Sequence, residues 1–108
     1  MITLVVALAL AAPNPSSIDA PRKAYAICIK TFESNQLKAK VDPAAYETAV
    51  KTACPSEAAA FTSALVAYDV AMGTKRAAAL ATAESDVADY RITSEERFRD
   101  LITVAKGN

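Results

Sequence analysis

Two cysteines are the residues of this chain whose type and spacing point to a definite reaction, which is disulfide formation. Cys28 and Cys54 are its only cysteines. If the chain folds back near residues 39–42, one cysteine lies about ten residues before the bend and the other about eleven after it. At about 1.5 Å per helical residue, both sulfurs are about 15 Å from the bend and meet across antiparallel helices. The sequence therefore predicts a Cys28–Cys54 disulfide.

Two other states of the cysteines are weaker interpretations. The two residues could remain as buried free thiols, as they do in reducing compartments. A redox-active pair is disfavoured, because the cysteines are far apart in sequence and lack the C-x-x-C arrangement. A disulfide in turn implies an oxidising compartment.

No other group of residues carries a complete catalytic or metal-binding pattern. Histidine is absent, which removes the commonest general base and the commonest transition-metal ligand. Ser63 and Ser85 lack a glycine-flanked nucleophile elbow. The densest acidic group lacks the spacing and central glycine of an EF-hand; it comprises Glu84, Asp86, Asp89, Glu95, Glu96 and Asp100. We interpret it as a solvated helix face whose charge is balanced by Arg91, Arg97 and Arg99. We expect no enzyme activity, no cofactor and no metal.

Charge and composition restrict the classes of partner. Lysine plus arginine and aspartate plus glutamate both number 12, so the net charge is zero. Nucleic-acid binding needs clustered positive charge, whereas these basic residues are scattered among acids. Alanine is abundant and only two glycines occur, which favours helix over sheet.

The N-terminal residues resemble a targeting segment. Residues 2–12 are apolar apart from Thr3, and a Pro/Ser-rich stretch follows them. The run is about half as long as a membrane-spanning helix, and Ala9-Leu10-Ala11 fits a small-x-small cleavage site. We predict a signal peptide at 1–11, a flexible linker at 12–18, a helical domain at 19–108, and a periplasmic or secreted protein with no membrane span after cleavage. No basic residue follows Met1, so either the start lies upstream or the signal is atypical; a buried element of the domain is the alternative.

The elements that must position the cysteines are helices, bounded by proline and capping residues. Asp42-Pro43 is a helix start, and Pro55 ends the helix before it. Thr93, followed by Glu96, resembles a capping box. Apolar residues recur every three or four positions between these signals. The charged residues of the first helix are expected to face away from its buried stripe; they include Arg22, Lys23, Lys30 and Glu33.

The expected helices span 20–38, 43–53, 57–90 and 94–105. The pattern leaves open whether the third helix is continuous or bends at Gly73, and whether the last helix is separate from it or only kinked. These helices predict an all-α bundle of three or four helices, with a disulfide-stapled hairpin and one long alanine-rich helix.

A few polar residues beside apolar stretches are candidates for an interaction surface. Asp69 interrupts an apolar run and either pairs with a base from another helix or faces water. Alanines between residues 77 and 83 permit close approach of another helix, within the chain or from a second copy. The candidate surface comprises Asp69, Lys75, Arg76, Tyr90 and Arg91.

Several short motifs together are similar to those of a known group of proteins. The motifs are Tyr25-x-x-Cys28, Asp42-Pro43-Ala44-Ala45-Tyr46, Ala53-Cys54, Asp69-Val70-Ala71-Met72-Gly73 and Asp89-Tyr90-Arg91. Their order resembles that in small exported bacterial helical proteins with one cysteine pair and no assigned function. The resemblance spans most of the mature chain and transfers no functional residues. The architecture is also similar to that of periplasmic acid-stress chaperones.

The sequence thus favours a non-catalytic function. We expect an exported protein with a protein-interaction or structural role, whose partner is an unknown protein or a second copy. The alternatives are a small-ligand binding module, using a cleft between the hairpin and the second half of the 57–90 helix, and a periplasmic stress chaperone. A chaperone would loosen at low pH as its acids lose their ion-pair partners.

Overall fold

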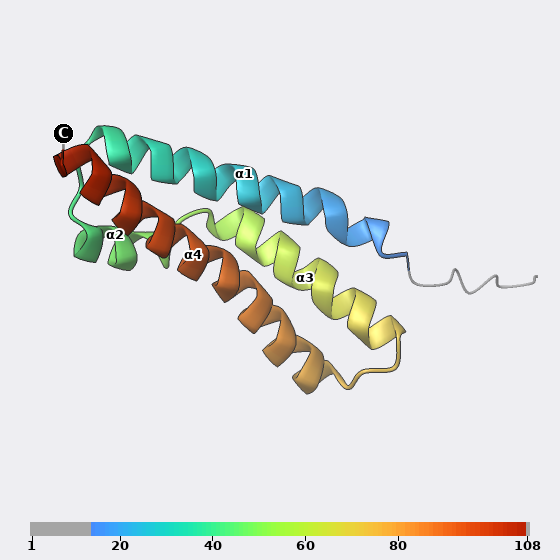
Figure 1. The fold of residues 1–108 in the computed structure, drawn as a ribbon. Helices are drawn as coiled ribbons and strands as arrows, with labels where there is room; N and C mark the ends of the chain where they lie inside the picture. The colour runs from blue at the N-terminus through green and yellow to red at the C-terminus, as the bar shows by residue number, and fades with distance from the viewer. Residues whose placement is uncertain (1–13, 108) are drawn as a thin grey trace, which may run out of the picture.

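The computed structural model describes residues 14–107, which form helices joined by short turns (Figure 1). The helices are α1 (Ser16–Lys38), α2 (Pro43–Val50), α3 (Pro55–Ala71) and α4 (Arg76–Gly107). The prediction of an all-α bundle with one disulfide is confirmed. The predicted signal peptide at 1–11 and the start of the predicted linker lie outside the described residues. Within residues 14–107, no helix is both long enough and apolar enough to cross a membrane.

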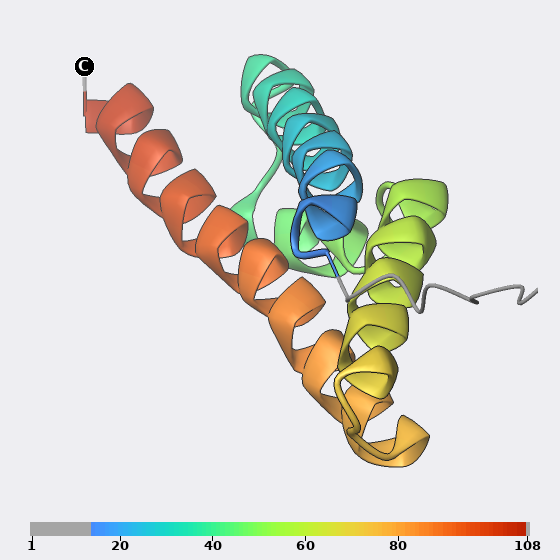
Figure 2. The same ribbon diagram turned by 90° about the vertical axis from the view of Figure 1, so that its right-hand side faces the viewer.

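Helices α1 and α4 each contact all three other helices, and the contacts of α4 are the more extensive. The N-terminal half of α4 pairs with α3, and its C-terminal half continues past α1 and α2, as the two views show (Figures 1 and 2). Helix α1 lies mainly against α3. Helix α2 packs against α4 and has few contacts with α1. The predicted hairpin of residues 20–53 is therefore not two arms packed side by side.

Helix α1 begins earlier than the sequence pattern indicates. The Asn14 side chain accepts a hydrogen bond from the Ser16 backbone N–H at 3.0 Å, which satisfies one free donor of the first turn. Ile18, within the predicted linker 12–18, is buried in the core. Asp19 lies inside the helix and pairs with Arg22 at 3.2 Å instead of capping it. Residues 16–18 therefore belong to the helical domain.

The chain between α3 and α4 breaks where a continuous helix over 57–90 is expected. Gly73 has a φ of +99°, a conformation that side chains with a Cβ rarely adopt. The Thr74 backbone N–H donates to the carbonyl oxygen of Asp69 at 2.9 Å and closes the end of α3. Of the alternatives for residues 57–90, the continuous helix is wrong, because the chain reverses at Gly73 and two helices form.

The predicted helix start at residues 93–94 is also wrong, since α4 runs unbroken from Arg76 to Gly107. The capping-box pattern of Thr93 and Glu96 is overridden by tertiary packing. The buried stripe of α4 passes through this point without changing face, at Ala79, Ala83, Val87, Ser94, Phe98 and Ile102. The long alanine-rich helix therefore exists, but it is α4.

Replacing Gly73 with alanine is expected to lower the free energy of unfolding by about 1–2 kcal/mol. The added Cβ would meet no atom within 4 Å, so the cost comes from the positive φ alone. Asparagine adopts a positive φ more readily than alanine does. Gly73→Asn is therefore the matched control and should lower the free energy of unfolding by less than Gly73→Ala. Urea unfolding of the three proteins measures this difference. Equal stability of Gly73→Ala and the unaltered chain would contradict it.

Two groups of aromatic rings fill the core. Tyr25 of α1, Phe61 of α3 and Tyr90 of α4 pack with ring centroids 5.5–6.0 Å apart. Tyr46 of α2 stacks on Phe98 of α4 at 3.9 Å and on Phe32 of α1 at 5.7 Å. Each group joins three helices, so the rings fix the crossing of α1, α2 and α3 on α4.

Candidate functional site

The Cys28–Cys54 disulfide is present, as the sequence predicts. Cys28 lies on α1, and Cys54 is the residue that precedes Pro55 at the start of α3. Because α2 ends at Val50, the bond joins α1 to the turn between α2 and α3, not two facing helices. Cys54 has a left-handed backbone with a φ of +56°, which is uncommon for a residue with a side chain. The disulfide therefore holds a strained turn against α1.

Glu57 is the acid nearest to the disulfide. Its carboxylate lies within 4.8 Å of the sulfurs of Cys28 and Cys54. Metal ions bind cysteine as the thiolate, and the sulfur atoms here are bonded to each other. The three side chains in this state do not form a metal site.

The buried polar centre of the bundle is a network of four side chains, which we call the Glu33 network: Glu33, Tyr46, Ser94 and Arg97. Arg97 Nε donates to Glu33 Oε1 at 2.7 Å, and Arg97 Nη2 donates to Oε2. Ser94 Oγ also donates to Glu33 Oε2, at 2.8 Å. Since Ser94 has one hydroxyl proton, the 2.6 Å contact with Tyr46 is a donation from the tyrosine hydroxyl. The network joins α1, α2 and α4.

The carboxylate of Glu33 stays charged although its side chain is buried. Glu33 is 5 % exposed and Ser94 is fully buried. Burial raises the pKa of Glu33, but hydrogen bonds from Arg97 and Ser94, with the charges of Arg97 and Lys30, outweigh it and hold the pKa below 4.5. Burial raises the pKa of Tyr46, although its bond with Ser94 opposes the shift. At neutral pH the network therefore consists of an ion pair and two neutral hydroxyls.

This arrangement holds helices together and offers no catalytic base or nucleophile. A carboxylate whose pKa is lowered is a poor general base at neutral pH. The Ser94 hydroxyl already donates to that carboxylate and has no exposed surface that a substrate could reach. The Glu33 network therefore sets the register of α1 and α2 against α4.

The sequence pattern assigns Glu33 to the solvent side of the first helix, and that assignment is wrong. Tyr25, Ile29 and Glu33 are successively four residues apart, which places Glu33 on the buried stripe. The spacing alone does not predict burial here, because Glu33 carries a charge and charged residues are mostly exposed. Arg97, assigned to balance the acidic face of α4, instead pairs with Glu33 across 64 residues.

The structure divides the predicted interaction surface between two places. Asp69, Lys75 and Arg76 lie at or near the turn between α3 and α4. Tyr90 and Arg91 lie about 21 Å further along α4, at about 1.5 Å per residue. Tyr90 packs on the rings of Tyr25 and Phe61, so most of its surface serves the core.

The Tyr25 hydroxyl is the one buried side-chain polar atom without a hydrogen-bond partner among the described residues. Burial raises its pKa, and the charge of Arg91 opposes that shift. The Tyr25 ring packs against the rings of Phe61 and Tyr90 in the core.

A shallow groove of about 240 Å³ lies between α1 and α4. Ile29 and Tyr90 supply apolar walls, while Asp89 lines one part and Lys30 and Arg97 line another. The sequence suggests a ligand cleft between the hairpin of residues 20–53 and the second half of the 57–90 helix. Of the residues that line this groove, Asp89 and Tyr90 belong to that segment, whereas Thr93 and Arg97 lie beyond it. Its lining is mostly apolar.

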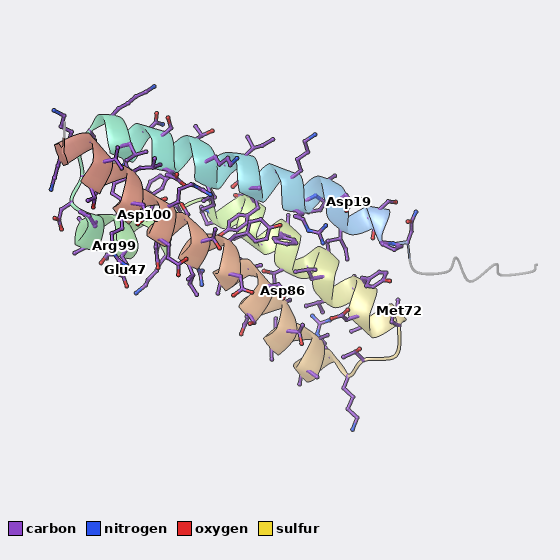
Figure 3. The ribbon with its side chains drawn as sticks, in the orientation of Figure 1. Asp19, Glu47, Met72, Asp86, Arg99 and Asp100 are labelled. Carbon is purple, nitrogen blue, oxygen red and sulfur yellow. A yellow bond between two sulfur atoms is a disulfide. The ribbon has the colours of Figure 1, made fainter. Side chains whose placement is uncertain are left out.

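The acidic residues of α4 do not form a cluster of metal ligands in the described part of the chain. Glu84, Asp86 and Asp89 are exposed on the helix surface. Figure 3 shows Asp86 in the N-terminal half of α4, and Arg99 beside Glu47 of α2, to which it is joined by a 3.9 Å ion pair.

Comparison of the chain with protein-family models, with curated proteins and with solved structures gives no match.

Proposed function

We propose that this chain is an exported, non-catalytic protein that acts through its helix faces on a protein partner or on a second copy of itself. The disulfide supports export, because such bonds persist in oxidising compartments. The apolar run at 2–12 supports it independently as a signal peptide. The similarity to small exported bacterial helical proteins belongs to the same proposal.

The observation that carries the interaction role is the set of large apolar side chains exposed at the end of the α3–α4 hairpin. Val70, Met72 and Leu80 are each more than 40 % exposed. Figure 3 shows Met72 at this end, away from α2. Exposed apolar side chains near one end of a small protein are typical of a protein-binding site. We call this region the hairpin end.

Cross-linking in the exporting cell, followed by mass spectrometry, tests this proposal. Lys75 is exposed within the hairpin end, whereas Lys51 is exposed in the turn between α2 and α3. We expect cross-links to a protein partner, or to another copy, through Lys75 and not through Lys51. Replacing Met72 with aspartate should reduce them. Cross-links spread evenly over both lysines, or none at Lys75, would contradict the proposal.

A small-ligand binding module is the second candidate, and the groove between α1 and α4 favours it. A ligand module should remain monomeric at all concentrations and keep this groove open. An interaction protein should give Lys75 cross-links. A stress chaperone would be a pH-dependent form of the first candidate, in which the loss of ion pairs at low pH exposes more apolar surface.

A further inference from the structure

Three exposed residues of α4 form a stripe that is complementary to itself. Arg76, Leu80 and Glu84 are successively four residues apart, so they lie on one side of the helix. All three are exposed, and Leu80 retains 42 % of its surface. Within residues 14–107, no ion pair includes Arg76 or Glu84. The stripe therefore presents an apolar side chain between two opposite charges without partners.

The order of the charges selects one kind of partner. If a second copy of the helix runs in the opposite direction, its Glu84 lies at the level of Arg76 and its Arg76 at the level of Glu84, with Leu80 between them. An antiparallel copy of α4, related by a twofold axis at Leu80, therefore brings Arg76 against Glu84 of the second copy, twice. A parallel copy would instead place like charges together. The charge pattern thus matches a second copy of this chain in one orientation.

The surface beside the stripe has the shape that such packing needs. Ala77 and Ala81 are exposed next to it and allow two helix backbones to approach closely. A groove of about 240 Å³ adjoins Leu80 between α3 and α4, and its walls include Val66 and Ala67. The other residues of α3 that line it are Thr62 and Ser63, so its α3 wall consists of short side chains that leave room for Leu80 of the second copy.

We propose that the chain forms an antiparallel homodimer through the stripe Arg76–Leu80–Glu84. The inference rests on the proposed function and deepens it by naming a second copy as the partner. The dimer places two α3–α4 hairpins against each other and buries Leu80 from both copies. The Glu33 network, on the other half of α4, remains outside this interface.

Charge exchange tests the dimer without disturbing the fold, since both charged side chains are exposed. Sedimentation of the purified chain, in a concentration series reaching the millimolar range, measures the dimer dissociation constant. Arg76→Glu and Glu84→Arg should each weaken dimerisation by about tenfold, since each turns two attractive contacts into repulsive ones. Mixing these two variants should restore association as a heterodimer. The double variant R76E/E84R should dimerise like the unaltered chain, as should Lys51→Glu, a charge reversal outside the stripe.

A purified chain that stays monomeric throughout the series would overturn the dimer. If the double variant R76E/E84R dimerised as weakly as the single variants, the dimer would also be overturned, because pairing of opposite charges would then not contribute to association. Circular dichroism of each variant shows whether its helices remain folded. Failure of the dimer is distinguishable from failure of the proposed function, because cross-links from Lys75 to a different protein would contradict only the dimer.

Discussion

Replacing Arg97 with methionine is expected to lower the free energy of unfolding by about 2–3 kcal/mol at neutral pH. The change leaves the buried carboxylate of Glu33 charged but without its cation. This expected loss lies at or below the lower end of the range for broken buried ion pairs, because Arg97 is 38 % exposed and water can reach the carboxylate of Glu33 in the variant. Methionine retains the aliphatic packing of the arginine side chain. Urea unfolding at neutral pH measures the effect.

The matched control is Arg99→Met on the same helix. Arg99 is 60 % exposed, and its contact with Glu47 is long, at 3.9 Å. We expect a loss of about 0.5 kcal/mol or less. Similar losses for the two variants would mean that the Glu33 network contributes no more than a surface pair.

The same comparison at low pH checks the protonation state of Glu33. Its pKa is lowered in the folded state, so its stabilising contribution is present above the ordinary value of 4.5 and is lost as the pH falls through the folded pKa. In Arg97→Met, burial without a cation should raise the pKa, so protonation of Glu33 relieves the unpaired charge. The stability difference between the two proteins should therefore start to narrow above pH 4.5, where Glu33 of the variant takes up a proton, and continue to narrow below pH 4.5 until Glu33 of the unaltered chain is protonated. A constant difference would contradict this assignment.

Removing the disulfide is expected to have the other largest effect. Cys28 and Cys54 are separated by 26 residues. In the chain-entropy model, a loop of that length corresponds to about 3.5 kcal/mol of stability, or roughly 14–20 °C in Tm. The variant C28A/C54A should therefore unfold at markedly lower temperature and urea concentration.

Reduction of the unaltered chain provides an independent route to the same result. A reducing agent should lower its Tm toward that of C28A/C54A and leave the variant unchanged. Mass analysis after alkylation determines how many thiols are free in protein purified without reductant. Two alkylated cysteines at full stability would contradict a stabilising role for the disulfide.

The helical class and the cysteine pair could be predicted from the sequence because their signals are local. Pro43 and Pro55 mark helix starts through their fixed φ, and the apolar residues repeat every three or four positions. The two cysteines lie at nearly equal distances from the turn at 39–42. The predicted bond is present although α2 ends at Val50, because Cys54 lies in the turn before α3 and bonds to Cys28 of α1.

The break at Gly73 and the continuity of α4 required the three-dimensional structure. A single glycine is tolerated in many helices, so its presence alone does not determine a reversal. The Thr93 and Glu96 pattern is locally a good helix start. It is overridden because Ser94 and Phe98 continue the buried face of α4 on the rings and helices around them.

The sequence by itself determined that this chain forms helices, where prolines bound them, and which cysteines can join. Only the tertiary structure decided that Glu33 is buried and that Arg97 and Ser94 are its partners. Backbone hydrogen bonds in a helix form within four residues, so they follow local sequence. The contacts of Glu33 join residues 61 and 64 positions apart, and they exist only because α1 and α4 cross at one place.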